Sequence, residues 1–223
     1  IVLLPGAHSS AATVTLDIAG VHITGIPSDV PHSKSRRNSG GRRNKATIVN
    51  TATAGIIFTV SALDVEISHL TFLPVAAGGR GISIAATVST NDRCYIHDCT
   101  FQLAATASTT TYGITVPAGV TADVLTDVLV SSCYFSSGTD TSSGANGGGV
   151  NIIGTAHGFT IENSTFELKG TAAWAAAIDM APLSVGALLG IVIRDNEFLN
   201  PTGTTTVITT AVRSVTATTI SSV

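Results

Sequence analysis

The sequence predicts an all-β protein that folds as a single-stranded parallel β-helix, a solenoid with coils of about 30 residues each. Three observations lead to this prediction. An eight-residue pattern recurs five times, a shorter glycine-led pattern recurs between its copies, and the composition favours closely stacked strands. Charged residues make up only 11% of the chain and aromatic residues 5%, while small and β-branched residues dominate. This balance suits strands better than helices.

The eight-residue pattern contains two apolar residues separated by one residue, then a short polar corner, then a phenylalanine. Its copies are residues 65–72, 94–101, 128–135, 159–166 and 191–198. The phenylalanines follow one another at intervals of 29, 34, 31 and 32 residues. Because alternation with period two is the strand period, the pattern indicates strands that recur once in every coil. We therefore expect the phenylalanines to stack in one internal column: Phe72, Phe101, Phe135, Phe166 and Phe198.

A second pattern, a glycine or alanine followed by a short strand, lies between these copies. It occurs at residues 55–58, 81–84, 113–116, 149–152 and 177–180. Residues 13–18 and 21–25 give a first coil without a phenylalanine. A β-sandwich is disfavoured because its hairpins would not repeat one octapeptide about every 30 residues. Leucine-rich repeats are excluded by the missing leucine frame, and helical repeats by the period of two.

The octapeptide, with Asn, Cys or Ser two residues before the phenylalanine, resembles the coil signature of the pectate-lyase-like β-helix superfamily. The resemblance extends from about Val14 to Phe198. It implies a right-handed helix, with one residue in each coil that turns inward at a corner and stacks as a ladder. In this chain the ladder would consist of Leu70, Cys99, Cys133, Ser164 and Asn196. Two of the three cysteines would then be small buried residues, and without CxxC spacing neither a zinc site nor a disulfide framework is expected.

We expect one β-helical domain over residues 1–223, with residues 27–46 as an inserted basic loop. The first residues resemble the middle of a coil and the last ones show no cap, whereas stacked coils need covered ends. The domain is therefore expected to be a segment of a longer chain, or to have its ends covered by a partner subunit. No signal peptide is visible. The longest charge-free apolar run, residues 180–193, is shorter than the roughly 20 residues that cross a bilayer, so no membrane span is expected.

The inserted loop carries six of the eleven basic residues: Lys34, Arg36, Arg37, Arg42, Arg43 and Lys45. Its proline, glycine, serine and asparagine content indicates a loop, and no aromatic residue lies between the charges. Such a segment can dock an acidic neighbouring subunit or contact a polyanion, and the alternative is a solvated loop without a partner. These six residues are the binding residues that the sequence predicts.

Acid–base chemistry would need suitable side chains at outward positions of neighbouring coils. The resemblance implies that enzymes of this superfamily gather acidic residues with Arg, Lys or His on one strand face, for Ca²⁺-assisted lysis or for a two-carboxylate glycosidase reaction. Here His69, His97 and Asp98 fall on neighbouring coils with Glu66 nearby, which makes this cluster the best enzymatic candidate. The same residues are also common at solvated corners.

The other outward columns contain fewer groups suited to acid–base chemistry. The glycine-led strand is expected to present Ile57, Ser83, Thr115, Asn151 and Asp179. Glu162 and Arg194, which share a column on successive coils, are expected to form a surface ion pair. Because no column holds two stacked carboxylates, the sequence predicts no catalytic residue, no metal site and no cofactor.

Composition and resemblance together favour a non-enzymatic component of a bacteriophage virion, such as a tail fibre, a spike or a capsid-surface protein. The expected location is the surface of the particle. The resemblance implies a homotrimer, with other virion proteins and host surface polysaccharide as further candidate partners. The alternative function is a polysaccharide depolymerase, a lyase or glycosidase from a phage tailspike or a secreted enzyme. A bacterial surface adhesin is a third candidate, disfavoured because no signal peptide is visible.

Overall fold

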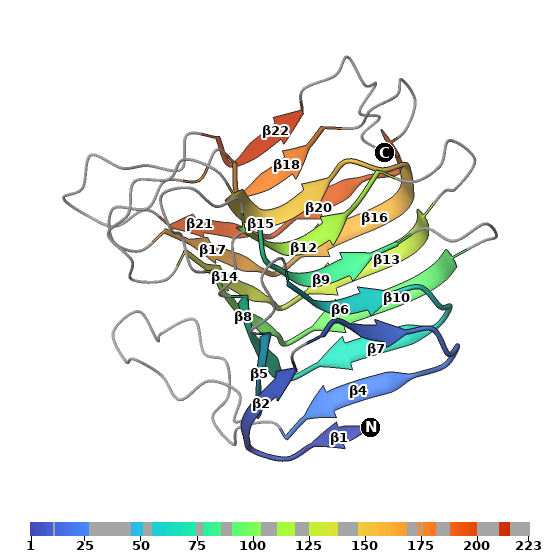
Figure 1. Cartoon of the computed structure of the whole chain (residues 1–223). Coiled ribbons are helices and arrows are strands. Elements are labelled where there is room, and N and C mark those ends of the chain that lie inside the picture. Colours follow the sequence, from blue (N-terminus) through green and yellow to red (C-terminus); the bar gives the residue numbers. More distant parts are fainter. Residues whose placement is uncertain are drawn as a thin grey trace.

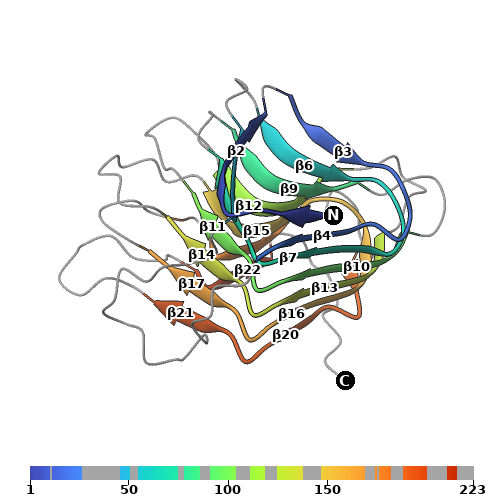
Figure 2. The ribbon, with the colours of Figure 1, turned by 90° about the horizontal axis from the view of Figure 1, so that it is seen from below.

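The chain winds into a right-handed parallel β-helix (Figures 1 and 2). The computed structural model describes residues 1–10, 12–26, 46–50, 55–74, 78–85, 91–103, 111–118, 125–137, 147–168, 174, 176–181, 188–199 and 210–214. These residues form 22 strands and no helix, so none of them belongs to a helix that could cross a membrane. Figure 2, a view from below, shows the chain turning clockwise as it moves away from the N-terminus. The predicted fold class is confirmed.

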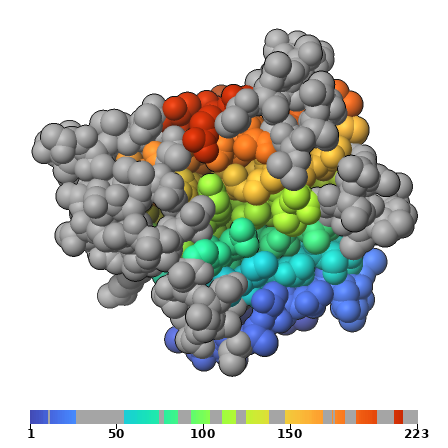
Figure 3. Space-filling view, turned by 45° about the horizontal axis from the view of Figure 1, so that its top comes forward, coloured from blue at the N-terminus to red at the C-terminus, as the bar shows by residue number. Residues whose placement is uncertain are grey.

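Three parallel sheets form the faces of the β-helix, and each of the first sixteen strands pairs with the strand three places further along the chain. Sheet A contains β1 (Val2–Leu3), β4 (His22–Gly25), β7 (Val65–Ser68), β10 (Asn91–His97), β13 (Leu125–Ser131), β16 (Ala156–Glu162) and β19 (Leu188–Leu189), with β20 (Val192–Arg194) also on β16. Sheet B contains β2 (Gly6–Ser10), β5 (Ala46–Asn50), β8 (Leu70–Pro74), β11 (Thr100–Gln102), β14 (Tyr134–Ser136), β17 (Thr165–Glu167) and β21 (Glu197–Leu199). Sheet C contains β3 (Val14–Leu16), β6 (Ile56–Val60), β9 (Arg80–Ile84), β12 (Thr111–Val116), β15 (Gly147–Ile152), β18 (Ile178–Met180) and β22 (Val212–Ser214). Three successive strands thus make one coil, and the space-filling view shows the described coils as layers in sequence order (Figure 3).

The predicted phenylalanine column is confirmed inside sheet B. Its rings stack with centroid separations of 4.9, 4.8, 4.7 and 5.2 Å from Phe72 to Phe198. The interplanar angles of the first three pairs are 9°, 6° and 5°. In-register parallel pairing sets this geometry, because the spacing of neighbouring strands is also about 4.8 Å. The first four rings are completely buried, so the column is the centre of the core.

Glycine is required opposite this column, on sheet C. A Cβ added at Gly81 or Gly113 would lie 2.8 or 2.7 Å from the ring of the phenylalanine in the next coil, and one at Gly149 would be 2.6 Å from Cδ1 of Phe166. Real Cβ atoms essentially never approach so closely. Ala177 takes the glycine position in the following coil, and there the last ring pair opens to 5.2 Å and 15°. The glycine of one sequence pattern and the phenylalanine of the other therefore pack against each other and form one packing unit.

One predicted register is wrong. Phe58 pairs with Ile82, so Ile57 rather than Gly55 occupies the position of Gly81. Thr59, not Ile57, consequently shares the outward column of Ser83. The core decides this register, because Ile57 and Phe58 are both buried and Phe58 packs edge-on against Phe72 at 5.6 Å and 83°.

The predicted corner ladder between sheets A and B is confirmed. Leu70, Cys99, Cys133 and Ser164 are buried, and Asn196 is partly buried. Asn196 Nδ2 donates to the Ile161 carbonyl at 2.9 Å, while its Oδ1 accepts from the Ser164 backbone N–H at 2.9 Å. The ladder thus satisfies backbone groups that the bend removes from the sheets.

All three cysteines are free and buried, which confirms the burial predicted for Cys99 and Cys133. The thiol of Cys133 lies 3.7 Å from the carbonyl oxygen of Ile96, and Cys99 has the same contact with Ile67. Burial raises the pKa of Cys94 to about 12 and that of Cys133 well above its usual value. These thiols are therefore unreactive packing groups.

Each of these corners turns on one residue in the left-handed backbone region. These residues are His69, Asp98, Ser132, Asn163 and Asp195, with φ between 50° and 55°. Asn, Asp and His tolerate this conformation better than most residues, which explains the polar corner of the octapeptide. A second left-handed column, which the sequence did not reveal, crosses sheet A and lies within β10, β13 and β16 at Arg93, Asp127 and Gly158. Its other members, Gly20, Asp64 and Gly190, lie just outside the neighbouring strands.

The packing of glycine against phenylalanine can be tested with Gly149→Ala. The added methyl group overlaps the Phe166 ring, so we expect the free energy of unfolding to fall by about 2 kcal/mol. Phe166→Leu alone should also destabilise the protein, through lost packing. In the double variant the two losses should overlap by at least about 1 kcal/mol, measured by urea unfolding. Strictly additive losses would contradict the proposed contact.

Candidate functional site

The six basic residues that the sequence predicts as binding residues lie outside the described part of the chain: Lys34, Arg36, Arg37, Arg42, Arg43 and Lys45. Their docking or polyanion contact therefore stays a prediction. The described chain instead offers three polar groupings on outward faces. Two of them lie on sheet A and one lies on sheet C.

The histidine–carboxylate cluster predicted from the sequence comes together on sheet A. The register of β7 with β10 places Tyr95 opposite Glu66 and His97 opposite Ser68. His97 Nδ1 lies 2.8 Å from Asp98 Oδ2, and His97 Nε2 lies 3.0 Å from Glu66 Oε1. The His69 ring meets the His97 ring edge-on at 5.8 Å. Three coils are thereby connected on one face, since Glu66 also contacts β4.

Two members of this cluster were missed from the sequence. His22 Nδ1 lies 3.2 Å from Glu66 Oε2, and the Tyr95 ring stacks on His97 at 4.3 Å. His22 could have been found, because the pattern of residues 21–25 aligns with that of residues 65–68. Tyr95 alternates with His97 on β10 and therefore points to the same face.

The surroundings of His97 favour its protonated form. The hydrogen bond with Asp98 raises the pKa of His97, burial opposes this, and the hydrogen bond with Glu66 raises the pKa further. A protonated imidazole donates from both nitrogens, which matches a carboxylate oxygen near each of them. With both nitrogens engaged, His97 cannot also take a proton from a substrate. Among the described residues, no group of three or more His, Cys, Asp and Glu could hold a metal ion.

A buried polar column runs along the outward face of sheet C. It consists of Ser83, Thr115, Asn151, Asp179 and Arg213, each paired in register with the next. The first four are only 1–4% exposed, although they point away from the core. The Arg213 guanidinium forms a bidentate ion pair with the Asp179 carboxylate, with Nε 2.9 Å from Oδ1 and Nη2 2.5 Å from Oδ2. Burial, and then the negative charge of Asp179, raises the pKa of nearby Tyr112.

This column has hydrogen-bonding capacity that the protein does not use. Thr115 Oγ1 and Asn151 Oδ1 are buried without a hydrogen-bond partner, and so is Arg80 Nε on the same sheet. Buried polar atoms of this kind are costly and rare in folded proteins. The sequence predicted the column except for Arg213, and it placed Ile57 where Thr59 extends the column. It could not show that Asp179 is buried in an ion pair.

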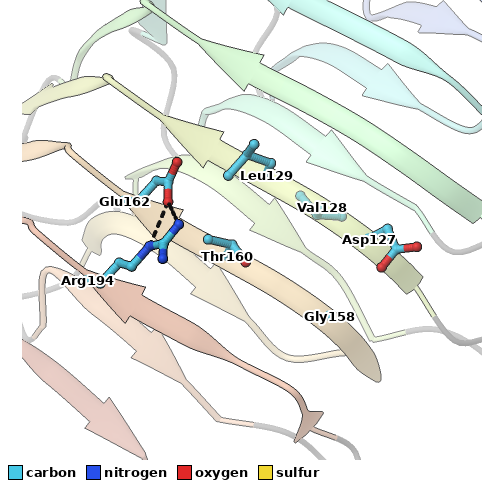
Figure 4. Close-up of a pocket in the computed structure, with 7 residues that line it drawn as sticks. All are labelled: Asp127, Val128, Leu129, Gly158, Thr160, Glu162 and Arg194. Carbon is cyan, nitrogen blue, oxygen red and sulfur yellow. Dashed lines mark hydrogen bonds and ion pairs between the residues drawn. The ribbon is translucent and has the colours of Figure 1, made fainter. Parts of the chain in front are cut away.

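A shallow depression of about 290 Å³ lies on the outer face of sheet A (Figure 4). Glu162 and Arg194 border one end, where Arg194 Nε and Nη2 lie 2.8 and 2.6 Å from Glu162 Oε2. This confirms the predicted surface ion pair. Asp127 borders the other end (Figure 4). Glu162 pairs with Ser131, four residues after Asp127, so the backbone positions of the two acidic residues are about 13 Å apart along the strand. The two carboxyl groups of a glycosidase lie roughly 5–10 Å apart, and Glu162 is held by Arg194 in an ion pair.

The ion pair on sheet C can be tested with Arg213→Met. Because the substitution leaves the Asp179 carboxylate buried without its cation, we expect the free energy of unfolding to fall by about 2–4 kcal/mol. Combining it with Asp179→Asn should recover part of this loss. Arg194→Met is the matched control, since Arg194 is 63% exposed and its ion pair should contribute little to stability. Equal losses at Arg213 and Arg194 in urea unfolding would contradict the buried character of the first pair.

Comparisons with protein-family models, with curated proteins and with solved structures found no match for this chain. The parallel β-helix is therefore established by the strand pairing itself. The pectate-lyase-like resemblance has only the octapeptide as its support. A function inferred from this resemblance is therefore a proposal.

Proposed function

We propose that this chain is a non-enzymatic structural component of a bacteriophage virion, a stable β-helical scaffold in a tail fibre, a spike or a capsid-surface protein. The observation that carries the proposal is that the repeated residues connect successive coils. Every recurring position of the octapeptide connects one coil to the next, through the phenylalanine column, the corner ladder or the strand pairing. A scaffold that must resist unfolding needs such continuous contacts between coils.

The surface of the first coil supports a role in assembly. Ile1, Val2, Leu4 and Ile18 are 62–71% exposed there. Large apolar groups exposed on one coil favour a contact with another protein surface. We propose that the scaffold is a homotrimer on the particle surface, in contact with other virion proteins.

The charge distribution supports the same role. The basic residues between Lys34 and Lys45 number six, and the rest of the chain has five basic and fourteen acidic residues. The basic segment of one copy is therefore complementary in charge to the body of its neighbour. We propose subunit docking as the role of this segment, with contact to a polyanion as the other outcome.

A polysaccharide depolymerase is the second candidate. The observation that favours it is the sheet C column, where Thr115 Oγ1 and Asn151 Oδ1 are buried beside Asp179 with hydrogen-bonding capacity unused. Sugar hydroxyl groups both donate and accept hydrogen bonds and could satisfy such atoms. The glycosidase reaction, however, needs two carboxylates at a defined spacing, which the Asp127 and Glu162 pair does not provide.

The assembly state is tested by light scattering of the purified chain at micromolar concentration. We expect the mass of a trimer. Reversal of the six basic residues to glutamate should shift the mass towards that of the monomer, because like charges would then face each other. A wild-type chain that stays monomeric would contradict the assembly proposal.

The absence of catalysis is tested with host capsule and lipopolysaccharide as substrates. The intact oligomer should release neither reducing ends nor unsaturated sugars, and Asp98→Asn and Asp179→Asn should behave like the wild type. Activity that disappears with either substitution would replace the structural proposal with the depolymerase. Detection of the protein among the components of purified phage particles would support the structural role directly.

A further inference from the structure

His97 lies at the centre of the histidine–carboxylate cluster, and its position differs from that of an ordinary surface histidine. Its side chain is only 16% exposed, and its two ring nitrogens face carboxylates from two different coils. Glu66 lies on β7 in the preceding coil, and Asp98 follows β10 in the coil of His97 itself. The structural function proposed above does not use this arrangement.

The hydrogen-bond geometry around His97 fits a protonated imidazole. A protonated imidazole donates one hydrogen bond to Glu66 Oε1 at 3.0 Å and one to Asp98 Oδ2 at 2.8 Å. A neutral imidazole carries one N–H, so its second nitrogen would present a lone pair to a carboxylate oxygen. Loss of the proton therefore costs a hydrogen bond and replaces an attraction with a repulsion.

Among the described residues, the charged groups that act on His97 are Asp98 and Glu66. From its own strand, Tyr95 stacks on the ring, and from the preceding coil the His69 ring meets it edge-on. On the next coil, β13 places the uncharged Ser131 opposite His97. Glu162 follows on β16, where Arg194 holds it in an ion pair.

His22 extends the cluster in the other direction. It lies 3.2 Å from the second oxygen of Glu66, on β4, and its side chain is 64% exposed. The sequence of groups is therefore His22, Glu66, His97 and Asp98, across the outer face of three consecutive coils. Only the central histidine has both nitrogens enclosed by carboxylates.

We propose that His97 is a pH-dependent clasp on sheet A, which in its protonated form ties the coil of β7 to the coil of β10 and which loosens when the proton is lost. Its protonated state stabilises the fold. The folded protein raises the pKa of His97, through the hydrogen bonds with Asp98 and Glu66. The stabilisation is thus complete below the value of about 6.5 for an unfolded histidine and disappears as the pH rises through the value in the folded protein. Mildly acidic solution tightens these coils, and alkaline solution loosens them.

The experiment compares thermal unfolding of the wild type and of His97→Gln between about pH 5.5 and about pH 9. Glutamine keeps one donor and one acceptor but does not titrate in this range. We expect the melting temperature of the wild type, relative to that of His97→Gln, to fall by roughly 2–4 °C from the acidic to the alkaline end. His157→Gln, on β16 of the same sheet, is the matched control and should keep the pH dependence of the wild type.

An NMR titration of the histidine rings in the wild type provides an independent readout, which does not depend on whether the variant folds. We expect the midpoint of His97 to lie above about 6.5, with both ring nitrogens protonated in mild acid. A midpoint at or below that value would overturn the proposal. So would a His97→Gln variant that folds and melts with the same pH dependence as the wild type.

Discussion

The stacking of each phenylalanine ring on its counterpart in the next coil is the interaction on which the rest of the structure depends. A parallel strand spacing of about 4.8 Å is also a favourable distance between aromatic rings. A ring in each of five successive coils then fixes the register of sheet B, as in the pairing of Phe101 with Phe135. It also dictates glycine on sheet C, because a side chain at Gly113 would overlap the Phe135 ring. The octapeptide thus recurs in the sequence because the same ring contact recurs between successive coils.

The corners follow from the same stacking. A coil that repeats in register must bend at the same place each time, and Asp98 and Asn163 adopt the same left-handed conformation to do so. The residue after each left-handed corner residue turns inward. At two corners this residue is Ser164 or Asn196, which hydrogen-bonds to backbone groups of neighbouring coils. Polar residues at the corner are therefore structural, which is why the presence of His, Asp and Asn there did not indicate chemistry by itself.

Most of the fold could be predicted from the sequence, because a contact that recurs about every 30 residues leaves a pattern that recurs at the same interval. The register of β6 was predicted wrongly because Gly55 was aligned with Gly81, whereas Ile57 occupies that position. The left-handed backbone of Arg93 was missed since arginine gives no signal for that conformation. Of the candidate site, the cluster of Glu66, His97 and Asp98 was found by aligning coils. Arg213 was missed because the segment after Phe198 contains no copy of the octapeptide to align.

The proposed roles also depend on the stacking. A scaffold is useful only if its coils stay in register, and the clasp at His97 acts between coils that the core already aligns. The most direct measurement is of ring-to-ring nuclear Overhauser effects in protein with labelled phenylalanine. Consecutive members of the series Phe72, Phe101, Phe135, Phe166 and Phe198 should give contacts, and members two coils apart should give none. Absence of the contact between Phe101 and Phe135 in the folded protein would contradict the in-register column and the packing unit built on it.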